Sequence, residues 1–163
     1  MKKEIVQIEW YRYDDVGELS HDDRLLLEQA QKAALLAYAP YSHFKVGAAV
    51  RLAGGTIVTG NNQENVAYPS GLCAERVALF HAHATNPGMK VEAIAITAIG
   101  AKAVIDEPVA PCGACRQVMA EFEHQSGINL KVIMQGQTGQ ILVAPSMAGL
   151  LPFSFLNDFL NKY

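Results

Sequence analysis

The chain begins with a stretch in which apolar and polar residues alternate. Within residues 4–13, Val6, Ile8 and Trp10 fall on one side, and the two residues between them are polar. A period of two is typical of a β-strand with one buried face. The stretch therefore predicts a half-buried strand at the start of the fold.

A helical period follows. Ser20 and Asp23 resemble a capping box in which Asp replaces the usual Glu. From Leu26 to Ala37, apolar residues recur at the spacing of one helix face, and Pro40 is expected to end the helix. The pattern predicts an amphipathic helix that packs on a core.

Alternation returns in residues 44–50. Gly54 and Gly55 are turn residues, and the segment 56–60 is expected to return as the second strand of a hairpin. The polar loop 61–71 then leads to the next predicted helix.

The rest of the chain alternates helices with strands. The almost wholly apolar residues 91–99 predict a central strand that is covered on both faces. The other predicted elements are helices at residues 73–85 and from Cys112, strands at 130–134 and 141–144, and a terminal helix marked by Leu156, Phe159 and Leu160. This order predicts an α/β fold, in which a mixed sheet lies between helical layers. We expect residues 1–163 to form one domain.

Composition narrows the class of protein. Half of the 163 residues are hydrophobic and 18% are charged, which is typical of a globular protein. Thirteen Lys and Arg against sixteen Asp and Glu give a net charge of −3, and only Lys2-Lys3 forms a basic run. Binding to nucleic acid is disfavoured, because it depends on clustered cations. No segment approaches the roughly 20 apolar residues of a membrane span.

All three cysteines lie in two short segments at the starts of predicted helices. Cys112 and Cys115 are three residues apart, a spacing that brings two side chains together in the first turn of a helix. With Cys73 they would give a zinc ion three thiolate ligands, which leaves the open fourth position of a catalytic site. An odd number of thiols with this spacing favours a reducing compartment, and we expect the protein to be cytoplasmic.

Glu75 is the candidate catalytic residue. It lies two residues after Cys73, a spacing that does not share a helix face, so it is poorly placed to bind the same metal. It could instead stand beside a zinc-activated water and move protons. Zinc lowers the pKa of its water from about 15.7 to roughly 7.

Five motifs in the same order resemble the small, homotetrameric, zinc-dependent cytidine deaminases. Two of them are the zinc segments Cys73–Arg76 and Pro111–Val118, and the others are Tyr41–Ala49, Asn62–Asn65 and Leu150–Phe155. The resemblance covers about residues 25 to 155 and leaves residues 1–20 as an N-terminal extension. It implies a three-layer α/β/α fold with a mixed, about five-stranded sheet.

The resemblance also implies an activity. Members of this family hydrolyse cytidine and deoxycytidine to uridine and deoxyuridine in pyrimidine salvage, with one Zn²⁺ per subunit. The expected partners are a small nucleoside substrate and three further copies of the chain, in a homotetramer with shared active sites. No nucleic acid or membrane is expected.

Substrate contacts follow from the resemblance residue by residue. Phe44 would stack on the pyrimidine, Asn62 and Glu64 would bind the sugar 3′-hydroxyl, and the backbone around Ala74 would bind the base. Tyr68 matches a position near the site. Without the resemblance, Phe44 would be interpreted as a core strand residue and Glu64 as an ordinary loop charge.

Three further residues are implied around these contacts. Arg76 and Gln117 match side chains that hydrogen-bond the ligand sulfurs, and such contacts tune a metal. Phe155 matches a ring that reaches into the pocket of a neighbouring subunit. Their alternative interpretations are a solvated helix residue for Arg76, an exposed one for Gln117 and a core residue for Phe155.

Two other functions remain possible from the residues alone. The same zinc chemistry could deaminate another small nucleoside, a free base or a nucleoside antibiotic. A non-catalytic, zinc-stabilised binding module is the alternative from another class, but it needs a fourth protein ligand and gives Glu75 no purpose.

Overall fold

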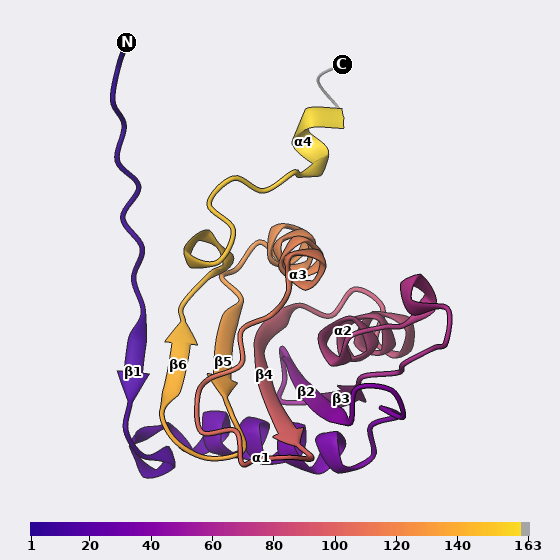
Figure 1. The fold of residues 1–163 in the computed structure, drawn as a ribbon. Helices are drawn as coiled ribbons and strands as arrows, with labels where there is room; N and C mark the ends of the chain where they lie inside the picture. Colours follow the sequence, from indigo (N-terminus) through magenta and orange to yellow (C-terminus); the bar gives the residue numbers. More distant parts are fainter. Residues whose placement is uncertain (161–163) are drawn as a thin grey trace.

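The structure is a computed structural model that describes residues 1–160. Its centre is a six-stranded mixed sheet with the strand order β1-β6-β5-β4-β2-β3 (Figure 1). The strands are β1 (Tyr11–Tyr13), β2 (Phe44–Leu52), β3 (Ile57–Asn61), β4 (Val91–Gly100), β5 (Lys131–Gln135) and β6 (Ile141–Ala144). β4 and β5 are parallel, and every other pair is antiparallel.

Helices cover the sheet on both faces. They are α1 (His21–Leu35), α2 (Ala74–Thr85), α3 (Gly113–Ser126) and the short α4 (Asn157–Leu160), with 3₁₀ turns η1 (Val16–Glu18), η2 (Tyr68–Ser70) and η3 (Met147–Gly149). α1 packs on one face, and α2 and α3 pack on the other. The three-layer α/β/α arrangement is confirmed, with one strand more than the expected five.

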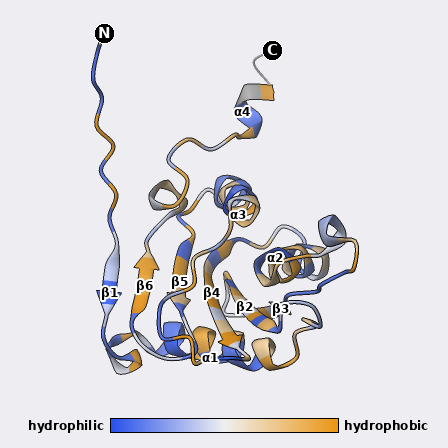
Figure 2. Cartoon of the chain, viewed as in Figure 1, coloured by the Kyte–Doolittle hydropathy of each residue, from blue (hydrophilic) through white to orange (hydrophobic). Residues whose placement is uncertain are grey.

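Two separate cores result from this layering. Leu26, Leu27 and Ala30 of α1 pack on the sheet residues Ala95 and Ile133. The larger core, on the other face, is formed by α2 and α3 against β2, β4 and β5. β4 contributes to both cores, so seven of its ten residues are buried, as the unbroken apolar run predicts. Figure 2 shows the resulting hydrophobic colouring of the central strands.

Two glycines let the helices approach the sheet closely. A Cβ atom on Gly47 would lie 2.0 Å from the carbonyl oxygen of Ala30 in α1, and one on Gly60 would lie 2.4 Å from the backbone nitrogen of Ala78 in α2. No side chain fits at either position. Gly60 therefore fixes how closely α2, which carries three candidate site residues, rests on the sheet.

The predicted boundaries of α1 and the hairpin are close to those observed. The Ser20 hydroxyl caps α1 by accepting a hydrogen bond from the Asp23 N–H at 3.2 Å. Gly54 and Gly55 both have positive φ at the turn between β2 and β3.

No helix within residues 1–160 combines the length and apolar character needed to cross a bilayer.

The predicted strand at residues 4–13 is only partly formed. β1 contains three residues, and the preceding side chains of Val6, Ile8 and Trp10 are 57%, 47% and 41% exposed instead of half-buried in a sheet. The reason is that β6, the partner of β1, ends at Ala144 and is followed by Pro145, which has no N–H to donate.

Candidate zinc centre and its pocket

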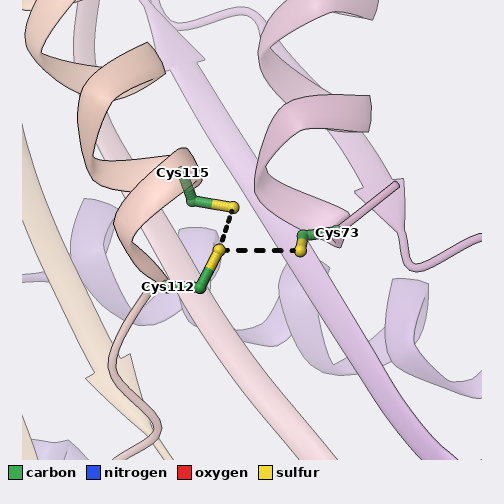
Figure 3. A group of neighbouring side chains, drawn as sticks. All are labelled: Cys73, Cys112 and Cys115. Carbon is green, nitrogen blue, oxygen red and sulfur yellow. Dashed lines mark hydrogen bonds between the residues drawn. The ribbon is translucent and has the colours of Figure 1, made fainter. Parts of the chain in front are cut away.

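The three cysteines meet where two helices begin. Cys73 and Cys112 are the N-cap residues of α2 and α3, and Cys115 lies in the first turn of α3. α2 and α3 lie on the same face of the sheet, and their first turns bring the three side chains together (Figure 3). Two segments that are distant in the sequence thus form one cluster.

The spacing of the sulfur atoms fits a zinc ion. The Sγ atoms of Cys73 and Cys112 are 3.9 Å apart, those of Cys112 and Cys115 are 3.4 Å apart, and all three lie within 4.8 Å of one another. Ligands at about 2.3 Å from a tetrahedral zinc ion place their sulfurs about 3.8 Å apart. Among residues 1–160 this is the one group of three or more His, Cys, Asp or Glu side chains with metal-binding spacing. The donor set therefore fits zinc with three protein ligands.

Local electrostatics favour a thiolate at Cys73. A hydrogen bond from the Cys115 thiol and the nearby Arg76 guanidinium lower the pKa of Cys73 to about 5, against the opposing effect of burial. Nη2 of Arg76 lies 3.7 Å from the Cys73 sulfur. The same hydrogen bond and burial raise the pKa of Cys115. The positive ends of the α2 and α3 dipoles add to the stabilisation of negative sulfur.

Glu75 lies in the first turn of α2 and lines the same pocket as Cys73 and Cys112. Its side chain is buried, with 4% exposure. Burial, and to a smaller extent the negative charge of Cys73, raise the pKa of its carboxyl group. A carboxyl group with a raised pKa can both accept and return a proton near neutral pH.

A pocket of about 630 Å³ opens beside the sulfur atoms. Its walls are the start of β2, the loop from β3 to α2, the first turn of α2, and the chain that precedes α3. The volume lies in the range of pockets that bind small molecules. Cys73, Cys112 and Glu75 all line this cavity, so a bound molecule could contact both the sulfur cluster and the carboxyl group.

Phe44 and Asn62 lie together in the wall of the pocket. Phe44 is 38% exposed, so it is not a core residue. The Asn62 side chain accepts a hydrogen bond from the Val46 N–H at 2.8 Å and donates one to the Phe44 carbonyl at 3.0 Å. Asn62 thus holds the backbone of the first residues of β2, and with it the position of the Phe44 ring.

Glu64 is tied to the segment before β2. Its carboxylate accepts hydrogen bonds from the backbone N–H groups of Tyr41 and Ser42, at 2.9 and 3.2 Å, and from the Ser42 hydroxyl. The Ser42 hydroxyl is the main reason that the pKa of Glu64 is lowered, and the Tyr41 N–H adds to the effect. Glu64 is therefore a carboxylate at neutral pH, and it lines the pocket.

The remaining predicted site residues differ in position. Tyr68 lines the pocket and is 76% exposed, with its ring centroid 6.2 Å from that of Tyr41. Ala74 follows Cys73 and is fully buried in the core beneath the site. Phe155 is 60% exposed and lies outside the set of residues, among those described, that line this pocket.

The Gln117 side chain contacts the C-terminal segment. Its Nε2 donates to the Phe155 carbonyl at 2.5 Å, and its Oε1 accepts from the Phe155 N–H at 3.4 Å. The amide therefore ties the C-terminal segment to α3. The hydrogen bond to a ligand sulfur that the resemblance implies for Gln117 stays a prediction.

Sequence reasoning assigned no role to several residues that shape the site. Tyr41 and Ser42 hold Glu64, and His43 takes the left-handed conformation, with φ of 55°, that turns the chain into β2. Arg116 donates to the carbonyls of Pro111 and Leu150, at 2.8 and 3.1 Å, and so anchors the second zinc segment. The motifs contained all four, but only the folded chain shows their contacts.

Comparison with known proteins identifies related chains. The family model of the cytidine and deoxycytidylate deaminase zinc-binding region matches residues 20–130. A cytidine deaminase of Halalkalibacterium halodurans is 38% identical over 140 residues, which are 84% of this chain and 99% of the relative. A cytidine deaminase of Sporosarcina psychrophila is 40% identical over 140 residues, which are 86% of this chain and 96% of the relative.

Solved structures agree with these relatives. The crystal structure of a cytidine deaminase from Burkholderia pseudomallei superposes with a TM-score of 0.71 at 42% identity, covering 84% of this chain and 100% of that chain. A cytidine deaminase from Mycobacterium tuberculosis superposes with a TM-score of 0.64 at 34% identity, covering 83% of this chain and 98% of the other. The similarity in sequence and in structure thus extends over nearly the whole of each relative.

Proposed function

The chain belongs to the cytidine and deoxycytidylate deaminase family, and from this premise we propose that it hydrolyses cytidine and deoxycytidine to uridine and deoxyuridine. One observation carries the proposal: two cysteines of a three-cysteine cluster with zinc spacing, Cys73 and Cys112, line one pocket of nucleoside size together with the buried carboxyl group of Glu75. A closed structural zinc site would need a fourth protein ligand. The binding-module alternative is therefore disfavoured.

The reaction exchanges an amino group for oxygen. Water forms a bond to C4 of the pyrimidine, the bond from C4 to the amino nitrogen breaks, and ammonia leaves. Zinc held by Cys73, Cys112 and Cys115 supplies the nucleophile when bound, because it lowers the pKa of water to roughly 7.

Glu75 moves the protons in this proposal. Its carboxylate accepts one proton from the attacking water and delivers it to ring N3, so that C4 becomes more electrophilic. It then accepts the second proton from the oxygen now bound to C4 and gives it to the amine, which leaves as ammonia while the C4 carbonyl forms. Its raised pKa matches this double role. Positioned proton transfer is typically worth roughly 10²–10⁴-fold in rate.

Phe44, Asn62 and Glu64 bind the substrate in this proposal. The Phe44 ring borders the pocket, where it can stack on the pyrimidine, and the Glu64 carboxylate can accept a hydrogen bond from the sugar 3′-hydroxyl. The backbone at Ala74 would bind the base, and Tyr68 would border the mouth of the pocket. A 3′-hydroxyl is present in both cytidine and deoxycytidine, so both are substrates.

The active assembly in this proposal is a homotetramer with shared sites. Phe155 is 60% exposed and is not among the described residues that line the pocket of its own subunit. In this proposal, as the family resemblance implies, its ring reaches the pocket of a neighbouring subunit. Three free thiols at the site need a reducing compartment, which supports action in the cytoplasm.

Replacing Glu75 by Gln tests the proposed function directly. We expect Glu75→Gln to retain its zinc, measured by metal analysis, and to release ammonia from cytidine at least about 100-fold more slowly than the parent. Glu121→Gln is the matched control, because this carboxylate lies on α3 outside the pocket and bonds to Gln125 at 3.2 Å. Deamination by Glu75→Gln at the parent rate would show that the proton role is wrong. A panel with cytosine and modified nucleosides separates the alternative substrates.

A further inference from the structure

Residues 4–12 form an extended, exposed segment, which we call the arm. It runs up to β1 and includes the first two residues of that strand. Figure 1 shows it running beyond the sheet, and Figure 2 shows hydrophobic and hydrophilic residues alternating along it. Besides the exposed Val6, Ile8 and Trp10, Ile5 and Tyr11 are 77% and 50% exposed. The family match begins only at residue 20, so the arm is not accounted for by the deaminase domain.

The arm continues an open edge of the sheet. β1 is the outermost strand and pairs with β6 through one edge only. Its other edge carries backbone N–H and C=O groups that no strand among residues 1–160 covers. An apolar strand with a free edge is a template for the addition of another strand.

We propose that the arm pairs antiparallel with the same arm of a second copy of this chain, with Ile8 opposite Ile8 on a two-fold axis. The interface is isologous, because each copy presents the same edge. The pairing joins the two sheets through β1 of each copy. β1 keeps its pairing with β6, which uses the other edge.

The arm sequence is complementary to itself in this register. Glu4 faces Arg12, Val6 faces Trp10 and Ile8 faces Ile8 on one side of the ribbon. On the other side Ile5 faces Tyr11 and Gln7 faces Glu9. By symmetry each unlike pair occurs twice. Cross-strand pairs of opposite charge, and of aromatic with aliphatic residues, are the combinations that stabilise antiparallel strands.

Other registers lose this complementarity. When two copies pair antiparallel through the same edge, each possible register places one residue of each arm on the two-fold axis, opposite its own counterpart. With Glu9 on the axis, two carboxylates oppose each other. With Gln7 on the axis, Lys2 faces Arg12 and Ile5 faces Glu9. Of these three registers, the Ile8 register alone has no like charges opposite each other and pairs apolar residues on both faces of the ribbon.

The ion pair is available for a second copy. Neither Glu4 nor Arg12 takes part in any of the four salt bridges found among residues 1–160. Both side chains are exposed. A two-fold pair of Glu4 with Arg12 would therefore form without breaking an existing contact.

A disulfide at the axis tests the pairing. In zinc-loaded, full-length protein we expect Ile8→Cys to form a reducible dimer, with twice the 17.7 kDa mass of one chain, under mild oxidation. Gln7→Cys is the matched control: it is one residue away on the other face, and its counterpart in the second copy is a diagonal neighbour at about 7 Å, too far for a disulfide. Equal cross-linking of both variants, or none in either, would overturn the proposal.

Charge reversal tests the register. In the Ile8→Cys background, Glu4→Arg or Arg12→Glu alone places like charges opposite each other twice per ribbon, and we expect the cross-linking rate to fall about tenfold. The double variant Glu4→Arg/Arg12→Glu restores the attraction and should recover the rate. A double variant that remains as slow as the single ones would contradict this register. Cross-linking is scored on the gel independently of deamination, so it can fail or succeed whatever the substrate proves to be.

Discussion

Cys73 illustrates how far single residues of the site depend on contacts across the fold. Its thiol pKa falls to about 5 because the Cys115 thiol and the Arg76 guanidinium both face its sulfur. Arg76 is three residues away on α2, whereas Cys115 lies on another helix. The first contact could be predicted from helical spacing, and the second only from the paired zinc motifs.

Glu64 gives a test at the same scale, because its carboxylate has two possible duties. Glu64→Ala removes both the proposed sugar contact and the anchor of Tyr41 and Ser42, so we expect KM for cytidine to rise at least about tenfold. Ser42→Ala removes one anchoring hydroxyl and leaves the carboxylate, so KM should rise only about twofold to fivefold. Steady-state kinetics of ammonia release measure both changes. An equal effect of the two variants would mean that Glu64 only holds the loop.

At the scale of secondary structure, one buried carboxylate ties α1 to the sheet. Asp23 accepts hydrogen bonds from Arg51 of β2 at 3.2 Å and from Lys131 of β5 at 2.9 Å. Burial raises the pKa of Asp23, but the hydrogen bonds from Lys131, Ser20 and Arg51 outweigh it and lower the pKa overall. The charged form is therefore favoured in the folded state.

This lowered pKa gives a pH-dependent prediction. Asp23→Asn should reduce the free energy of unfolding by about 1–3 kcal/mol at neutral pH. A carboxyl group with a lowered folded pKa contributes its stability above the ordinary value near 3.9 and loses it as the pH falls through the folded pKa. The difference between Asp23→Asn and the parent should thus shrink below about pH 4. Urea unfolding at several pH values measures it.

Glu92→Gln is the control for this prediction. Glu92 also lies near Arg51, at 3.5 Å, but its side chain is 41% exposed. An exposed ion pair contributes about 0–1 kcal/mol. If Glu92→Gln destabilised the protein as much as Asp23→Asn, the buried position of Asp23 would not be the cause.

The elements that could be predicted from the sequence are those marked by a local sequence pattern, such as a cap, a turn or an apolar run. The Ser20 cap, the Gly54-Gly55 turn and the apolar run of β4 were each sufficient to place a boundary or a layer. The predicted strand did not form at residues 4–10, because alternation shows a strand-forming preference but not whether a partner strand exists. Gln117 and Glu64 bond to segments 38 and 22 residues away, and no local pattern encodes such pairings.

At the scale of the whole molecule, the proposed sharing of sites between subunits can be tested by mixing variants. Glu75→Gln lacks the proton carrier, and Phe155→Ala lacks the ring offered to the neighbouring pocket. In an equal mixture of the two, some sites combine Glu75 from one subunit with Phe155 from the other. About a quarter of the sites should then regain parent activity, if assembly is random.

Co-expression followed by an assay of ammonia release measures this recovery. Each variant alone, at the same total concentration, is the control. A mixture whose rate is merely the mean of the two separate rates would place Phe155 outside the neighbouring site.

The most direct measurement is a zinc titration of metal-free protein, with ammonia release from cytidine followed at each addition. We predict no turnover without zinc, and a rate of ammonia release that rises linearly with added zinc until one zinc is bound per chain. We predict that Cys112→Ser never reaches the parent's maximal rate. Full turnover in the metal-free protein, or a zinc-saturated chain that releases no ammonia from cytidine, would contradict a hydrolytic deaminase built on three cysteines and Glu75.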